Sequence, residues 1–161
     1  MKIVILGAGA VGSTLASLLC QENDLVVVDH DSSELHRLEE EADIKTLTGG
    51  ASYPNILVNA GIQEADMVVA VTGSDETNIV SCMIAKVLNK SIKTIARVRE
   101  ISYLKGKTKE AMDSGEIPVD IHISPEQLIT EHIQGLIEIP GSLQVMEFGQ
   151  GKLNLVAVRA V

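Results

Sequence analysis

The chain has 161 residues, of which 45% are hydrophobic and 2% aromatic, and its formal net charge is -9. This length is typical of one domain with a short addition, and the apolar fraction is enough for a sizeable core. An acidic surface repels nucleic-acid phosphates and anionic lipid, and base stacking needs aromatic side chains that are scarce here. We therefore expect no nucleic-acid partner and no direct lipid binding.

Short aliphatic runs recur along most of the chain. Strands of a parallel sheet that is covered on both faces have this pattern. The predicted strands are Ile3–Leu6, Leu25–Val28, Ile44–Leu47, Met67–Val71, Thr94–Val98 and Ile121–Ile123. Helical patterns follow them at residues 11–21, 33–42, 54–60, 75–89 and 103–112. This alternation predicts an α/β fold with a doubly wound parallel sheet, Rossmann-like, in the strand order 3-2-1-4-5-6.

The helix starts carry recognisable signals. Asp31 or Ser32 is expected to cap the second helix, Ser52 the third, and the fourth begins after Ser74. Leu35 and Leu38 should face inward from the second helix. From the fourth helix, the residues expected to face the sheet are Ile79, Cys82, Met83, Ala85 and Val87.

The tail departs from the alternating pattern. A helix is predicted over Pro125–Ile139, with an apolar stripe of Ile129, Ile133, Leu136 and Ile137, and Pro140-Gly141 should end it. Two strands then flank Gly149-Gln150-Gly151, which is a hairpin signal. Because a lone hairpin is marginally stable, it should belong to a further module or pair with another chain.

The first predicted turn matches the phosphate-binding pattern G-x-G-x-x-G. The matching residues are Gly7, Ala8, Gly9, Ala10, Val11 and Gly12. Gly7 allows a tight turn, Gly9 lets a diphosphate approach the backbone, and Gly12 allows close helix packing. The pattern follows a predicted strand and opens a predicted helix, so helix amides should face the phosphates. The alternative is a tight turn without a ligand.

Asp29 ends the second predicted strand, at the offset where this pattern places a ribose-binding acid. Its carboxylate would accept hydrogen bonds from ribose hydroxyls. A 2′-phosphate would meet Asp29 and Asp31 without an adjacent arginine, so the sequence favours NAD(H) over NADP(H).

Other predicted strands end at residues that suit the same ligand edge. Gly50 and Gly73 would allow close backbone approach, and Arg97 would bring a positive charge to the phosphates. Two alternatives stay open at this point. The glycines are ordinary turn residues, and Arg97 or Arg99 pairs with a surface acid.

The remaining reactive side chains form no recognisable site. Cys20 and Cys82 fall within apolar helical patterns, which predicts two buried, reduced thiols, and the four histidines are scattered. We expect no metal site and no catalytic residue. No apolar run reaches the roughly 20 residues of a membrane span, so a cytoplasmic protein is expected.

Six segments resemble one family when they are taken together. They are "MKIVILGAGAVG", "VVVDHD", "DMVVAVTGSDETN", "IARVR", "GEIPVDIHISPEQL" and "IPGSLQV". In this order they resemble the N-terminal nucleotide-binding domain of the TrkA family, the cytoplasmic regulatory subunit of bacterial Trk potassium uptake. The resemblance covers the whole chain, and "AVTGSDETN", "IARVR" and "SPEQL" with "IPG" are its most specific parts.

The resemblance implies a sensor and not an enzyme. Such domains bind NAD(H), and in some members ATP or ADP, form dimers and rings, and lie beneath an integral-membrane potassium channel subunit at the inner membrane. The implied ligand contacts are residues 7–11, Asp29, Thr72-Gly73 and Arg97, with Gly50-Ala51 as a further loop. ATP-gated members often carry arginine where this chain has Ala10, which puts ATP selectivity in question.

The resemblance also implies a division of the chain. Residues 1–139 would form the dinucleotide-binding regulatory domain, and residues 140–161 would start a second, truncated module. Family members are commonly longer, so the chain is expected to be a fragment. The tail helix is the candidate crossover element of a dimer, and the alternative is that its stripe packs on its own sheet.

Two other functions fit parts of the sequence. The first is the cofactor domain of an NAD-dependent dehydrogenase, although no substrate domain follows and no histidine or lysine falls in a catalytic motif. The second is an interaction module with an empty nucleotide pocket. Turnover of NADH would identify the first, and the absence of any ligand-induced thermal shift would identify the second.

Overall fold

The computed structural model describes residues 1–138, 142–148 and 153–158. The chain divides into two compact units, Met1–Ile123 and Ser124–Val161. The tail helix therefore belongs to the second unit, and the expected domain boundary after residue 139 stays a prediction.

The first unit is built on one parallel sheet. Its strands are β1 (Lys2–Leu6), β2 (Asp24–Asp29), β3 (Lys45–Thr48), β4 (Met67–Ala70), β5 (Lys93–Arg97) and β6 (Ile121–Ile123). The strand order is β3-β2-β1-β4-β5-β6 and every pairing is parallel. The predicted doubly wound, Rossmann-like fold is confirmed.

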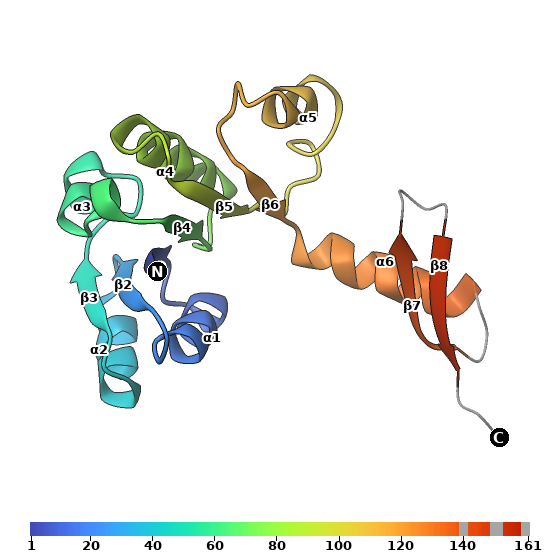
Figure 1. Cartoon of the computed structure of the whole chain (residues 1–161), viewed down its shortest axis with the longest axis horizontal. Helices are drawn as coiled ribbons and strands as arrows, with labels where there is room; N and C mark the ends of the chain where they lie inside the picture. The colour runs from blue at the N-terminus through green and yellow to red at the C-terminus, as the bar shows by residue number, and fades with distance from the viewer. Residues whose placement is uncertain (139–141, 149–152, 159–161) are drawn as a thin grey trace. The chain divides into compact units, whose positions relative to one another are not determined.

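Helices cover both faces of this sheet (Figure 1). One face carries α1 (Ala10–Leu19) and α2 (Ser32–Glu41), and the other carries α3 (Pro54–Asn59), the 3-10 turn η1 (Ile62–Glu64), α4 (Asp75–Leu88) and α5 (Gly106–Asp113). Successive strand residues point to opposite faces. Ile5 therefore packs in the same cluster as Leu38 of α2, while Leu6 packs in the same cluster as Leu57 of α3.

The helix starts agree with the sequence in two of three places. The Asp31 carboxylate accepts the Ser33 amide at 2.9 Å, and the Ser74 hydroxyl accepts the Thr77 amide at 3.1 Å. The prediction for α3 is wrong, because Tyr53 rather than Ser52 precedes the helix and its side chain makes no capping bond. Pro54 opens that helix and lacks an N–H, so fewer amides need a cap.

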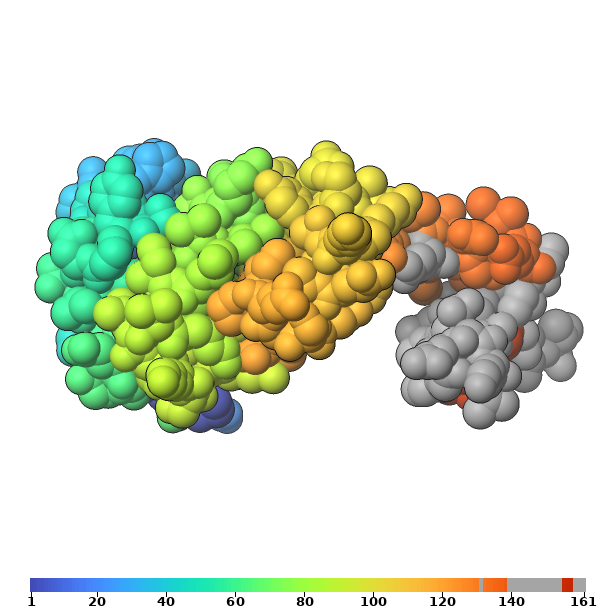
Figure 2. Space-filling model, turned by 90° about the horizontal axis from the view of Figure 1, so that it is seen from above, coloured from blue at the N-terminus to red at the C-terminus, as the bar shows by residue number. Residues whose placement is uncertain are grey.

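The buried face of α4 is narrower than predicted. Ile79, Cys82 and Ala85 are buried, but Met83 is exposed and Val87 is 80% exposed. A helix turns about 100° per residue, so residues one and five places beyond Cys82 point away from the sheet. Helices α3 and α4 lie side by side on this side of the unit (Figure 2).

In the second unit, the residues that the structure describes form one helix and one antiparallel strand pair. Helix α6 spans Pro125–Glu138, and β7 (Ser142–Phe148) pairs antiparallel with β8 (Leu153–Val158). The predicted helix and strand pair are confirmed, while Pro140-Gly141 and Gly149-Gln150-Gly151 lie outside the described residues. Within the described ranges, no helix has the length and apolar character needed to cross a membrane.

Candidate functional site

A cavity of about 680 Å³ lies at the carboxyl ends of the parallel strands. This is the edge at which open α/β sheets bind ligands. Its walls come from the segments that follow β1 to β5, which the doubly wound order brings together. The lining residues are Gly7, Gly9, Ala10, Val11, Val28, Asp29, His30, Asp31, Glu34, Gly50, Ala51, Ser52, Tyr53, Val71, Thr72, Gly73, Ser74, Thr77 and Arg97.

The sequence-predicted contacts all line this cavity except Ala8 and Gly12. Ala8 is fully buried, and its amide donates to the Asp29 carboxylate at 2.6 Å. Gly12 is buried within α1. These two residues build the wall, and the others face the cavity.

The three loop glycines are needed for different reasons. Gly7 has a φ of 109°, and a Cβ there would lie 3.0 Å from the Thr72 nitrogen. A Cβ at Gly12 would lie 1.8 Å from the Gly7 carbonyl oxygen. Gly9 has an ordinary φ of -63°, and a Cβ there would meet nothing within 4 Å. Neither conformation nor packing requires glycine at position 9, so its missing side chain leaves open space.

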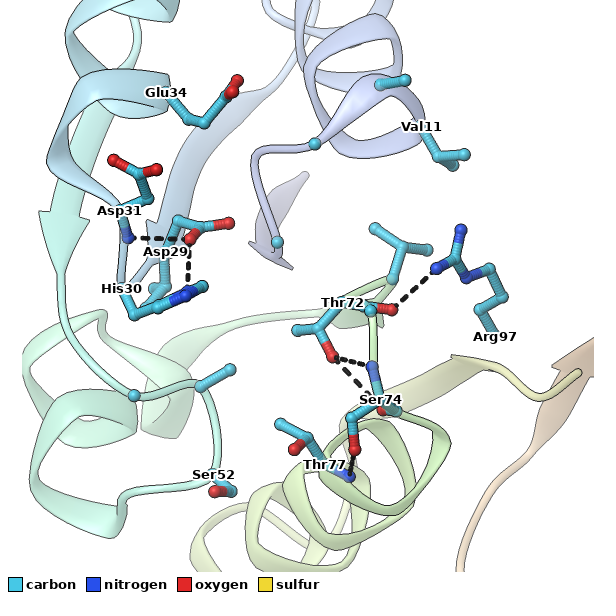
Figure 3. Close-up of a pocket in the computed structure, with 18 of the residues that line it drawn as sticks. Val11, Asp29, His30, Asp31, Glu34, Ser52, Thr72, Ser74, Thr77 and Arg97 are labelled. Atoms are coloured by element: carbon cyan, nitrogen blue, oxygen red, sulfur yellow. Dashed lines mark hydrogen bonds and ion pairs between the residues drawn. The ribbon is translucent and has the colours of Figure 1, made fainter. Parts of the chain in front are cut away.

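Asp29 fixes the acidic side of the cavity (Figure 3). Its side chain is 11% exposed, and one oxygen accepts the Ala8 amide. The other oxygen accepts the Asp31 amide at 2.9 Å and lies 2.8 Å from Nδ1 of His30. The carboxylate is thus tied to the glycine loop on one side and to the start of the α2 segment on the other. Asp31 and Glu34 extend this acidic wall.

The opposite wall is held by a buried amide. Asn78 of α4 is fully buried, and its Oδ1 accepts the Thr72 amide at 2.9 Å. Its Nδ2 donates to the Arg97 carbonyl at 2.9 Å. Asn78 therefore connects the ends of β4 and β5 through its side-chain amide. The sequence pattern did not reveal this role, because a residue within a helix gives no sign of which strand ends it contacts.

Arg97 supplies the positive charge of the cavity. Its Nη2 donates to the Thr72 carbonyl at 2.9 Å, and its Nε is buried without a hydrogen-bond partner. Within the described ranges Arg97 makes no ion pair, whereas Arg99 lies 3.5 Å from the buried carboxylate of Asp75. The surface-acid alternative thus holds for neither arginine as stated. The Arg97 guanidinium keeps donor capacity for an anion.

Several cavity residues were not among the predicted contacts, notably His30, Ser52, Tyr53, Ser74 and Thr77. Each lies between a predicted strand end and the first turn of the next predicted helix. This position along the chain was the signal that could have identified them as cavity residues. Gly50 lines the cavity as predicted, but the space beside it is taken. A Cβ there would lie 3.0 Å from two ring carbons of Tyr53.

The two cysteines lie in different environments. Burial raises the pKa of the Cys82 thiol to about 12. Cys20 is half-buried rather than buried, and both thiols are free. Across the part of the chain that the structure describes, no three histidine, cysteine or acidic side chains are placed to hold a metal ion. The cavity combines open backbone, a fixed carboxylate and one arginine, which suits an extended anionic ligand with hydroxyl groups.

Comparison with known proteins identifies the family of this chain. The family model of the TrkA-N domain matches residues 3–125. The "Trk system potassium uptake protein TrkA" of Halomonas elongata is 50% identical over 161 residues, which are 99% of this chain and 35% of that protein. The chain therefore spans about a third of the length of this curated relative.

Solved structures share the fold. The TrkA-N domain of the inner membrane protein ybaL from Escherichia coli has a TM-score of 0.71 at 20% identity, covering 84% of this chain and 96% of that one. The GsuK channel bound to NAD has a TM-score of 0.71 at 21% identity, covering 92% of this chain and 25% of that one. The matched family model, the relative that is 50% identical and the shared fold agree with the resemblance noted in the sequence. The chain belongs to the TrkA-N domain family.

Proposed function

We propose that the chain is the nucleotide-sensing part of a regulatory subunit of bacterial Trk potassium uptake, with NAD(H) as its ligand. The observation that carries this proposal is the open space at Gly9, opposite the fixed carboxylate of Asp29. The relative with 50% sequence identity is named as a potassium uptake protein, and a solved structure that shares the fold is a channel bound to NAD. Both names support the assignment.

The proposed ligand runs along the carboxyl edge of the sheet. Its diphosphate would lie over residues 7–11, at the amino end of α1, where free amides and the helix dipole favour negative charge. The adenosine ribose would bind Asp29. The second half would lie toward Thr72, Gly73 and Arg97. Gly73, like Gly9, faces open space, since a Cβ there would meet nothing within 4 Å.

The acidic wall supports a preference between NAD(H) and NADP(H). Hydrogen bonds from the Ser33 hydroxyl and amide lower the pKa of Asp31 from its ordinary value, so Asp31 is charged at neutral pH. A 2′-phosphate on the ribose would face Asp29, Asp31 and Glu34. We therefore propose NADH and NAD⁺ as ligands in preference to NADPH. ADP and ATP are the second choice, because Ala10 supplies no charge to a terminal phosphate.

The proposed role is regulation rather than catalysis. A ligand shifts an equilibrium only if it binds two arrangements of the assembly with different affinity. Here the arrangements would be those of a homodimer or larger ring, in the cytoplasm and attached to the inner membrane through the potassium channel subunit. We prefer this role to a dehydrogenase cofactor domain because the relative that spans this chain is named for potassium uptake.

The Gly9→Ala variant tests the proposal. Its Cβ should fit the unliganded protein and collide with a bound diphosphate, so NADH affinity should fall at least tenfold while the melting temperature changes little. Titration calorimetry with NADH, NADPH, ADP and ATP measures the affinities. Leu18→Ala is the matched control, because Leu18 is an exposed α1 residue that does not line the cavity. Equal NADH affinity in wild type and Gly9→Ala, or no binding by wild type, would contradict the proposal.

A further inference from the structure

Tyr53 is an exposed aromatic residue at the cavity. The chain contains one phenylalanine, two tyrosines and no tryptophan. Tyr53 lines the cavity, yet it is 61% exposed, whereas Tyr103 packs against the core. Leaving a large aromatic side chain in water forgoes the free energy of its burial. An exposed ring at the wall of a ligand cavity points to a flat ligand surface that would cover it.

The backbone holds Tyr53 in place. Its amide donates to the Gly50 carbonyl at 3.0 Å, and its own backbone is extended, with φ -87° and ψ 123°. Pro54 restricts the preceding residue to this region of backbone space. Tyr53 is therefore fixed between the turn after β3 and the first turn of α3.

Gly50 provides the seat for the ring. A Cβ at position 50 would lie 3.0 Å from Cδ2 and from Cε2 of Tyr53 and 3.2 Å from Cγ. Such contacts are closer than packed carbons tolerate, and here they involve the near part of the ring rather than a flexible end. A larger residue at position 50 would make the ring shift by a few tenths of an ångström from this position. The missing side chain of Gly50 thus makes room for Tyr53 rather than for the ligand backbone contact expected from the sequence.

The sheet order determines which part of a nucleotide reaches Tyr53. Strand β2 lies between β1 and β3, and Asp29 is in register with Thr48 at the end of β3. With the diphosphate over the loop after β1 and the ribose at Asp29, the base continues toward the end of β3. Tyr53 lies in the segment that follows this end.

We propose that Tyr53 stacks on the base of the bound nucleotide and that Gly50 is its seat, so that this pair selects a ligand with a planar base. The inference rests on the proposed function and names the base-binding residue of the same site. Stacking on an aromatic side chain contributes enough per base to change affinity about tenfold or more.

Tyrosine fluorescence tests the stacking directly, because the chain has no tryptophan. In Tyr103→Phe, all tyrosine emission comes from Tyr53, and ADP should quench it in a saturable way. Inorganic pyrophosphate, which has the diphosphate and no base, should leave it unchanged. In the control Tyr53→Phe, the emission of Tyr103 should stay unchanged when ADP is added.

Affinities test the Gly50 seat. Tyr53→Ala and Gly50→Ala should each weaken ADP and NADH about tenfold, Tyr53→Phe should stay within about threefold of wild type, and the double alanine variant should bind no worse than either single one. Melting temperatures establish that each variant is folded. If wild type binds ADP and NADH and Tyr53→Ala binds them equally well, this inference alone is overturned. If wild type binds neither, the proposed function falls with it.

Discussion

Asp29 combines a structural and a ligand-binding task in one side chain. Its oxygens accept the Ala8 and Asp31 amides, which positions both the glycine loop and the acidic wall. The same carboxylate is the proposed acceptor for ribose hydroxyls. A substitution there should therefore reduce affinity partly through the lost ribose contact and partly through a looser loop.

We expect Asp29→Asn to weaken NADH binding by about 1–3 kcal/mol, because a hydrogen bond to a charged group is replaced by one to a neutral amide. Titration calorimetry measures the change. Asp43→Asn is the matched control, since Asp43 is an exposed acid that does not line the cavity, and it alters net charge equally. An equal loss in both variants would mean that overall charge, and not a ribose contact, controls the affinity.

Asp120 illustrates how one side chain joins several elements. It directly precedes β6, and its carboxylate accepts the Thr94 amide of β5 at 2.7 Å and lies 2.9 Å from Nζ of Lys86 in α4. Burial disfavours its charged form, but the hydrogen bonds from Thr94 and Lys86 outweigh this and lower its pKa below the ordinary 3.8. The edge strand β6 is thus attached through a charged contact as well as through its ladder.

The lowered pKa makes this contact pH-dependent. A carboxyl whose folded-state pKa is depressed stabilises the fold above its unfolded pKa, and the stabilisation is lost as pH falls through the folded value. We expect Asp120→Asn to lower the free energy of unfolding by about 1–2 kcal/mol at pH 7, and this difference from wild type should shrink below about pH 4. Urea unfolding of Asp120→Asn and wild type at pH 7 and at pH 3 measures this difference in the free energy of unfolding.

The control for this prediction is Asp113→Asn, which removes an exposed i,i+4 ion pair with Lys109. Exposed pairs contribute little, so its effect should be small at both pH values. A difference between Asp120→Asn and wild type that stays constant from pH 7 to pH 3 would show that the charge is not what stabilises β6.

At the scale of the whole molecule, the apolar stripe of α6 is an exposed surface among the described residues. Ile129, Ile133 and Ile137 are exposed, with Ile137 at 72%, while Leu136 is half-buried. The alternative, in which this stripe packs on the chain's own sheet, stays a prediction, since α6 and the sheet belong to different units. Water contact with an apolar helix face is unfavourable, which supports the proposed pairing with a second copy.

We expect Ile133→Glu to convert a dimer of this chain into a monomer, because a charge would be buried in the proposed interface. Light scattering during size-exclusion chromatography measures the mass. Leu18→Glu is the control, since Leu18 is likewise an exposed aliphatic residue, in α1. A wild-type chain that stays monomeric at high concentration would refute the dimer.

The sequence alone determined the strand order and placed Gly7, Gly9 and Asp29 at the carboxyl edge of the sheet. Aliphatic runs, helix caps and glycine spacing are local signals, and right-handed crossovers leave few ways to connect them. Gly7, Gly9 and Asp29 could be selected because their spacing along the chain reflects one turn and one strand of fixed geometry.

Only the tertiary structure decided which residues meet across elements. The contacts of Asn78 with the ends of β4 and β5 and the exposure of Val87 depend on how α4 packs on the sheet. Helical periodicity gives an apolar arc, but the neighbouring element determines how much of that arc is covered. Likewise, a glycine in a sequence does not say whether its empty space belongs to the chain or to a ligand. The space at Gly7 is closed by Thr72 from a distant segment, whereas Gly9 faces open space.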